Sequence, residues 1–500
     1  MRYPFRVSDV EIEMSDRPNI LVIQGDQHRW DCLGAYGNVD VKTPHIDGLA
    51  GDGVRYDNSY CPFPSCTPSR YSFLTSLYPH QHCGLTNHST IPQGLATFPK
   101  ILRSAGYRTK AVGKMHFTPT YADLGFSEMV LAEQNGAGRY DDDYHRWLRD
   151  EGLENFVDLM DQEREYRKDA PQEYWDRVGA MVSDLDEAHH STTWIGDRAV
   201  EELETWEGGG NLLMTSFIKP HHPLDPPAPW DEMYDPESLT LLPGYTPEPL
   251  ARDLAHSPGY FPNAEMTEEK IRGAMGMYYG TISQIDHHVG RMVAALKARG
   301  LYDNTLILYN SDHGDYMGYH HLLLKGNYMY ESVIRVPLII KYPGQTNGGT
   351  ASDALVNSID AAPTLLNVTG CEVPSEMVGA DLRSGVQDRE VIFAEVGRDY
   401  MVRSRRHKLL LCQNDDRSLF FDLEADPFEI ENRYTDPDYA EAISELKEAL
   451  AKWMLFDTKA PVHLDEDAPI ISTPNAQRQN DGHRKEIYGY FQDRMQAGLR

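Results

Sequence analysis

The 500-residue sequence contains few cysteines and few basic residues for its length. Six cysteines are too few for the disulfide-stabilised scaffold that small secreted domains use. Lys and Arg number 47 against 77 Asp and Glu, which gives a formal net charge of −30 at pH 7. Because binding to nucleic acid needs a basic surface, this imbalance argues against a nucleic-acid partner.

Long apolar runs are absent as well. No stretch approaches about 18 consecutive apolar residues, the length that a membrane-spanning helix needs, so no membrane partner is expected. The segment before Pro18 is acidic and lacks the apolar core of a secretory signal. We therefore expect a cytoplasmic protein, the alternative being that a signal has been removed from the chain.

The sequence does contain a regular alternation of strand and helix patterns. Hydrophobic residues make up 40% and charged residues 25%, which is typical of a globular protein. Helical stretches are expected at Leu95–Ala105, Thr193–Glu204 and Lys270–Arg299. They alternate with short apolar runs typical of buried strands, at Ile20–Gln24, Thr109–Val112, Leu212–Phe217 and Thr305–Tyr309. The alternation predicts an α/β fold in which a large, mostly parallel sheet is sandwiched by helices.

A different pattern begins at about Arg389. Antiparallel strands are expected at Glu390–Val396, Tyr400–Cys412 and Ser418–Leu423, followed by one amphipathic helix over Asp436–Met454. The chain therefore divides into a large N-terminal domain (residues 18–375), a smaller C-terminal α+β subdomain with an antiparallel sheet (376–460) and a polar tail (461–500).

The segment of about residues 135–190 interrupts the α/β alternation and is rich in acidic and aromatic side chains. We interpret it as an exposed helical insert with a solvated face. The alternative is a lid or a wall that recognises the substrate.

Polar residues cluster directly after each of the four predicted strands. Ligands bind outside the carboxyl ends of the strands in open parallel sheets, so the four clusters are expected to converge on one site. The clusters are Asp26-Gln27, Lys114 with His116, His221 with its neighbours Lys219 and His222, and Asp312-His313.

These residue types suit a tetrahedral oxyanion ester. Carboxylate and amide oxygens with one imidazole nitrogen favour a divalent cation such as Ca²⁺, Mg²⁺ or Mn²⁺ over a structural zinc ion. The basic side chains are donors to an anion. The expected metal ligands are Asp26, Gln27, Asp312 and His313, and the expected anion donors are Lys114, His116, His221 and Lys325.

Cys66 opens a second motif, Cys-Thr-Pro-Ser-Arg. Thr67 is a good N-cap and Pro68 a good first helical residue, which places Cys66 at the mouth of a helix. A helix N-terminus binds anions and lowers the pKa of a thiol, and Arg70 adds a positive charge one turn further on. The alternative is a buried structural cysteine.

The chain resembles the type I, formylglycine-dependent sulfatases of the alkaline phosphatase-like superfamily, from Pro18 to about Trp453. The motifs that carry the resemblance are Cys66-Thr-Pro-Ser-Arg70, Gly113-Lys-Met-His116, Lys219-Pro-His221 and Ser311-Asp-His-Gly314. The combination of Asp26-Gln27 with Asp312-His313 resembles the metal-binding motif of the choline sulfatases and the phosphonate monoester hydrolases. The Lys114/His116 pair, which those hydrolases tend to lack, favours sulfate over phosphonate.

The resemblance implies that a maturation enzyme converts Cys66 to Cα-formylglycine, the nucleophile, and that Cys66 joins the metal ligands. It implies that Arg70 and Lys114 stabilise the formylglycine hydrate and that His116 acts nearby as an acid or base. His221 and Lys325 would bind the sulfate and assist the leaving group. Ca²⁺ is the metal expected, with Mn²⁺ and Mg²⁺ as alternatives.

The sequence thus predicts a sulfatase that cleaves sulfate monoesters of a sugar or small alcohol. The first alternative is a phosphonate monoester or phosphodiester hydrolase on the same scaffold, and the second is an inactive metal-binding protein. Self-association into a homo-oligomer is left open.

Overall fold

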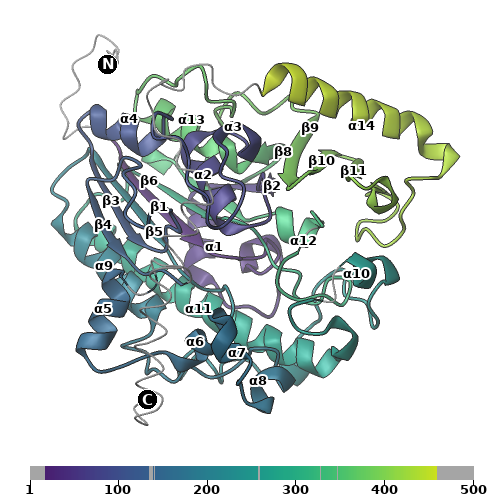
Figure 1. The fold of residues 1–500 in the computed structure, drawn as a ribbon. Coiled ribbons are helices and arrows are strands. Elements are labelled where there is room, and N and C mark those ends of the chain that lie inside the picture. The colour runs from purple at the N-terminus through teal and green to yellow at the C-terminus, as the bar shows by residue number, and fades with distance from the viewer. Residues whose placement is uncertain are drawn as a thin grey trace.

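The computed structural model describes residues 17–134, 139, 141–256, 259–326, 328–345 and 347–458. Figure 1 shows a large central sheet between two layers of helices, with a smaller sheet and its helix α14 at one end. The predicted tail, residues 461–500, lies outside the described residues. None of the helices within the described ranges is long and apolar enough to cross a membrane.

The central sheet has eight strands in the order β4-β3-β5-β1-β6-β7-β2-β8. All neighbouring pairs are parallel except the two made by β7, which runs antiparallel to β6 and β2. The strands are β1 (Asn19–Gly25), β2 (Val54–Tyr60), β3 (Arg108–Gly113), β4 (Glu128–Leu131), β5 (Asn211–Ser216), β6 (Thr305–Ser311), β7 (Leu338–Lys341) and β8 (Thr350–Asn357). The predicted fold class is confirmed.

Both faces of this sheet are buried, because the central strands are apolar on both sides. Ile20 and Val22 of β1 pack into the core on one face, beneath α2, α4 and α13. Leu21 and Ile23 pack into the core on the opposite face, beneath α1, α9 and α11. These helices are α1 (Pro44–Asp52), α2 (Cys66–Thr75), α4 (Phe98–Ser104), α9 (Ser191–Thr205), α11 (Glu268–Ala298) and α13 (Ala361–Val368). Shorter helices are α3 (Pro79–His82), α10 (Ala251–His256) and α12 (Glu331–Ile334).

The C-terminal subdomain is a four-stranded antiparallel sheet in the order β12-β11-β10-β9. Its elements are β9 (Val391–Val396), β10 (Asp399–Ser404), β11 (His407–Leu411), β12 (Leu419–Asp422) and α14 (Ala440–Lys452). Residues Tyr400–Cys412, predicted as one strand, form the hairpin of β10 and β11. Both strands are apolar and similar in pattern, and only the short polar turn at Arg405-Arg406 separates them.

One face of this small sheet packs against α14 and the other against the large domain. Val402, Leu409 and Phe420 contact the apolar stripe of α14. Met401 and Leu410, which point the opposite way, join a core shared with residues of the large domain. The alternation of side chains along each strand therefore fixes the subdomain in place.

The insert is helical, as predicted, and has a buried face as well as an exposed one. It forms α5 (Asp143–Asp150), α6 (Phe156–Gln162), α7 (Arg164–Arg167) and α8 (Gln172–Asp176). Asp142, Asp158 and Asp161 are buried within it. Asp158 pairs with Arg139, and Asp161 accepts a hydrogen bond from Tyr174. The prediction of a helical insert with a solvated face is confirmed, because Arg146, Lys168 and Asp176 are exposed, but the opposite face of the insert holds buried, paired carboxylates that the sequence did not predict.

A buried ion-pair group joins the subdomain to the large domain. The Lys408 Nζ atom, fully buried, lies 2.7 Å from Glu429 Oε1 and 3.2 Å from Glu331 Oε1. Arg403 Nε lies 3.1 Å from the same oxygen of Glu331. A buried carboxylate that loses its cation carries a large desolvation penalty.

We expect Lys408→Met to lower the free energy of unfolding by about 3–5 kcal/mol, because it leaves two buried carboxylates short of a cation. Lys447→Met, on the exposed side of α14, is the matched control and should change it by less than about 0.5 kcal/mol. Denaturant unfolding of both variants measures the difference. Equal midpoints would show that the ion pairs contribute nothing to docking.

Candidate active site

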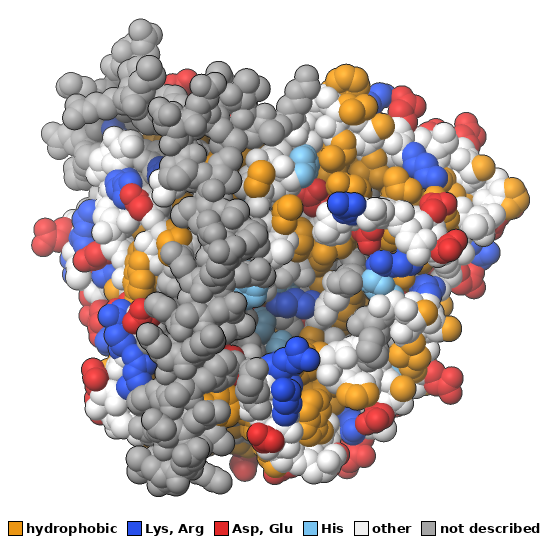
Figure 2. Space-filling model, viewed as in Figure 1, with side chains coloured by type: hydrophobic (Ala, Val, Ile, Leu, Met, Phe, Trp, Pro, Cys, Tyr) orange, Lys and Arg blue, Asp and Glu red, His pale blue; other side chains and the backbone are white. Residues whose placement is uncertain are grey.

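The four strand-end clusters meet at one edge of the sheet. β3, β5, β1 and β6 are consecutive in the strand order and parallel, so the residues that follow them lie side by side. Histidine and basic side chains are visible in a recess near the middle of the face in Figure 2. The structure therefore brings together the site residues that the sequence singled out.

Arg70 connects all four strand ends and is 1% exposed. Its Nε atom donates to Asp312 Oδ2 at 2.8 Å, and a terminal nitrogen donates to Asp26 Oδ2 at 2.9 Å. The other terminal nitrogen donates to Ser216 Oγ at 2.8 Å and to the Lys114 carbonyl at 2.6 Å. The planar guanidinium thus fixes the two carboxylates relative to each other.

The helix that carries Cys66 begins two residues earlier than predicted. Cys66 is the first residue of α2, and the N-cap position belongs to Ser65, whose side chain makes no capping hydrogen bond. Thr67, the predicted N-cap, instead donates from Oγ1 to the His116 carbonyl at 2.9 Å. Asn87, from a loop beyond α3, accepts a hydrogen bond from the Thr67 backbone N–H. A residue distant in sequence therefore does the work of the local cap.

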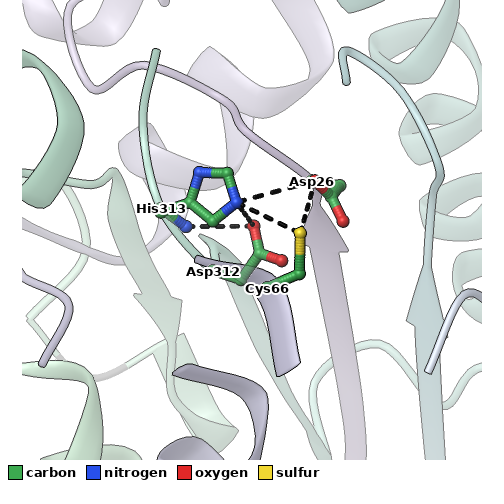
Figure 3. Close-up of side chains that lie close together, drawn as sticks. All are labelled: Asp26, Cys66, Asp312 and His313. Carbon is green, nitrogen blue, oxygen red and sulfur yellow. Dashed lines mark hydrogen bonds and ion pairs between the residues drawn. The ribbon is translucent and has the colours of Figure 1, made fainter. Parts of the chain in front are cut away.

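The Cys66 thiol lies among charged groups. Sγ is 3.3 Å from His313 Nε2, 3.2 Å from Lys325 Nζ and 3.7 Å from Asp26 Oδ1. Figure 3 shows Asp26, Asp312 and His313 pointing toward this sulfur. Burial alone would raise the pKa of the thiol, but Lys325 and Lys114 outweigh burial and hold the pKa well below its usual value.

The same group fits a divalent metal ion. Ligand atoms of Asp26, Cys66, Asp312 and His313 all lie within 4.8 Å of one another. His313 Nδ1 faces the Gly314 carbonyl at 2.9 Å, so it carries a proton and leaves the lone pair of the neutral ring on Nε2. Gln27 is buried, and its Oε1 atom has no hydrogen-bond partner among the described residues.

Two carboxylates hold the neighbourhood of this group together. Burial would raise the pKa of Asp26, but the positive charges of Lys114 and Arg70 keep it well below its ordinary value. Lys114 Nζ lies 2.8 Å from Asp26 Oδ2. Glu133 accepts hydrogen bonds at 2.9 Å from the backbone N–H groups of Met115 and His116. These contacts direct the Lys114 and His116 side chains into the site.

The two adjacent histidines after β5 separate into different environments. His221 Nδ1 donates to the His222 carbonyl at 2.7 Å. Burial lowers the pKa of His221, and the charges of Lys325 and Lys114 lower it further. His222 instead turns its ring to Asp161, with 2.5 Å between Nδ1 and Oδ2. Of these two histidines, His221 is therefore the one that belongs to the site. Lys219 pairs with Asp225 outside the site.

Sequence reasoning missed several residues of the site. Glu133 and Gln134 follow β4, which has only four residues and one buried side chain, too short a pattern to recognise as a strand. Asn87 and Ser216 carry no charge that would distinguish them from ordinary loop and strand residues. Their hydrogen bonds to Thr67, His116, Lys114 and Arg70, rather than any spacing in the sequence, identify them.

Comparisons with known proteins agree with this geometry. The sulfatase family model matches residues 18–371, and the model described as N-sulphoglucosamine sulphohydrolase, C-terminal, matches residues 318–455. An arylsulfatase of Clostridium perfringens is 31% identical over 87% of this chain and 94% of its own length. A choline-sulfatase of Rhizobium meliloti is 28% identical over 84% of this chain and 83% of its own. The solved phosphonate monoester hydrolase of Silicibacter pomeroyi is 26% identical, with a TM-score of 0.72 over 88% of this chain and 95% of its own.

Gly113, the last residue of β3 and the neighbour of Lys114, is a testable constraint on the site. Its φ of +92° is unfavourable for other residues, and an added Cβ would lie 2.1 Å from the Ser216 carbonyl oxygen. We expect Gly113→Ala to displace Lys114 and to destabilise the fold by more than the roughly 1–2 kcal/mol that a left-handed conformation costs a non-glycine residue.

Gly300→Ala is the matched control, because Gly300 also has a positive φ, +69°, but no atom within 4 Å of an added Cβ. Gly300→Ala should lower the free energy of unfolding only by the cost of the left-handed backbone conformation and should leave activity unchanged. Thermal unfolding and turnover of both variants test this, and similar behaviour of the two would contradict the predicted clash.

Proposed function

Because the chain belongs to the sulfatase family and is a sulfuric ester hydrolase, we propose that it cleaves sulfate monoesters of a sugar or small alcohol. The nucleophile proposed is Cys66 after conversion to Cα-formylglycine by a maturation enzyme. One observation carries the proposal: the Cys66 side chain lies at the first residue of α2, inside a buried group of carboxylates, imidazole and ammonium.

The proposed metal ligands are Asp26, Gln27, Asp312 and His313 with the modified Cys66. Their oxygen donors and single imidazole nitrogen favour Ca²⁺, with Mn²⁺ or Mg²⁺ as alternatives. A divalent cation bound there would polarise a sulfate oxygen as a Lewis acid. The unpartnered Gln27 oxygen supports this assignment, as does the lone pair on His313 Nε2, which faces Cys66 and Lys325 within the group.

Formylglycine, when hydrated, supplies two hydroxyl groups on one carbon, one to attack sulfur and one to release sulfate as the aldehyde re-forms. The protein orients this carbon through α2 and surrounds it with cations. Lys114 and Arg70 stabilise negative charge on the nucleophile's oxygens, and His116, beside the Cys66 side chain, moves the proton.

His221 and Lys325 act on the opposite side of the sulfate. The charge of a bound sulfate ester favours the protonated imidazole, opposing the cations that lower the pKa of His221. With Nδ1–H held by the His222 carbonyl, Nε2 can deliver its proton to the leaving oxygen as the sulfur–oxygen bond breaks. Lys325, 3.2 Å from the sulfur of Cys66, donates to the sulfate.

A phosphonate monoester or phosphodiester hydrolase is the second candidate. The likeness to the Silicibacter pomeroyi enzyme supports it, as does the Asp-Gln and Asp-His pattern. Lys114 and His116 favour sulfate, because each contributes a donor to the nucleophile. Rates on the sulfate and the methylphosphonate esters of one phenol separate the two candidates.

We expect mass spectrometry of the peptide that contains Cys66, from co-expression with a formylglycine-generating enzyme, to show a loss of about 18 Da, the change from CH₂SH to CHO. The tryptic peptide Trp30–Lys42, which contains Cys32, is an internal control and should keep its thiol. Turnover by protein whose Cys66 is entirely unmodified would contradict the proposed nucleophile.

Asp312→Asn should lower the bound metal measured by elemental analysis after dialysis, because an amide is a weaker and uncharged ligand. The metal-dependent rise in melting temperature should shrink with it. Asp197→Asn, a change of the same chemistry on α9, is the control and should retain metal. Equal metal content in both variants would place Asp312 outside the site.

A further inference from the structure

Gln134 connects two parts of the site that the sequence predicted separately. It follows β4 at the start of the insert, and its side chain is fully buried. Gln134 Oε1 accepts from Lys114 Nζ at 3.1 Å. Its Nε2 donates to the His222 carbonyl at 2.7 Å and to Asp158 Oδ1 at 3.2 Å.

The chemistry of these partners permits one orientation of the amide. An ammonium only donates, while a carbonyl and a carboxylate oxygen only accept. The Gln134 oxygen must therefore face Lys114, and its nitrogen must face His222 and Asp158. A flipped amide would oppose like groups at all three contacts.

The His222 carbonyl is the second half of the connection. It accepts three N–H donors, from Gln134 at 2.7 Å, from Gln162 of α6 at 2.8 Å and from His221 Nδ1 at 2.7 Å. The carbonyl thus holds the His221 ring, and the two glutamines hold the carbonyl.

We propose that Gln134 is a positioning residue that sets the His221 imidazole relative to the Lys114 ammonium. The inference rests on the proposed function, in which these two groups serve the leaving oxygen and the nucleophile. The Lys114 ammonium contacts the side chains of Asp26 and Gln134, and these two contacts orient its remaining N–H toward the nucleophile. Through His222, the same amide keeps the His221 ring aimed at the leaving oxygen.

The insert gains a role from this arrangement. Asp158 and Gln162 of α6 and Asp161, which holds the His222 ring, all belong to it. One face of the insert therefore packs against the residues that hold His221, while its other face remains exposed.

Leaving-group dependence tests the proposal, because a positioned proton donor matters most when the leaving oxygen is basic. Phenyl sulfate releases a phenol with pKa of about 10, and 4-nitrophenyl sulfate releases a more acidic one. We expect Gln134→Met to lower kcat about 30–100-fold on phenyl sulfate and only about 3–10-fold on 4-nitrophenyl sulfate, with KM little changed.

Gln162→Met provides a second variant that does not touch Lys114. It should lower kcat on phenyl sulfate a few-fold and leave 4-nitrophenyl sulfate unaffected, and it keeps the proposal testable where Gln134→Met folds poorly. Gln172→Met, at an exposed position of α8, is the matched control and should change neither rate. Equal losses on both substrates in the two buried-site variants would overturn the proposal.

A double-mutant cycle with His221→Ala completes the test. Once His221 is absent, adding Gln134→Met should lower kcat on phenyl sulfate only by the small factor seen on 4-nitrophenyl sulfate. An undiminished loss would show that Gln134 does not act through His221. If His221→Ala lowers kcat by the same factor on both substrates, the proposed role of His221 as proton donor fails instead. The two failures are therefore distinguishable.

Discussion

The site depends on one buried cation, the guanidinium of Arg70. Its donors bind Asp26 after β1, Asp312 after β6, Ser216 at the end of β5 and the backbone of Lys114 after β3. A buried charge of this kind is stable only when it is fully paired and hydrogen-bonded, and the four neighbouring strand ends supply those partners. The parallel sheet order makes this possible, because β3, β5, β1 and β6 end at the same edge. The geometry of the two carboxylates therefore follows from the fold.

The charges that surround Cys66 are balanced in a way that suits an anion. Arg70, Lys114 and Lys325 are three cations against the carboxylates Asp26 and Asp312. In the unmodified chain a Cys66 thiolate offsets the excess, which is the physical reason that the thiol pKa is low. A neutral aldehyde at this position would remove that negative charge and leave the excess positive charge for a sulfate group. In the proposed function, the same residues stabilise a thiolate before the conversion of Cys66 and an anionic substrate after it.

Much of this could be predicted from the sequence, and the limits have physical causes. The strand-end residues of the site were predictable because buried parallel strands give continuous apolar runs, and polar residues after them must meet at one edge. The buried face of the insert was missed because Asp158 and Asp161 resemble surface acids unless their partners are known. Gln134 was invisible because β4 has a single buried residue and its amide partners come from distant segments. In both cases the role of the side chain depends on hydrogen bonds and ion pairs to residues distant in sequence, which no local sequence pattern encodes.

The overall charge of −30 does not conflict with an anionic substrate. Exposed acidic groups are screened within about 8 Å at physiological ionic strength, while buried charges are screened much less. Arg70 and Lys114 lie within the buried group and therefore dominate the field at the sulfate position. The buried cations therefore act on a sulfate ester in the recess at short range, where the screened charge of the distant surface does not oppose them.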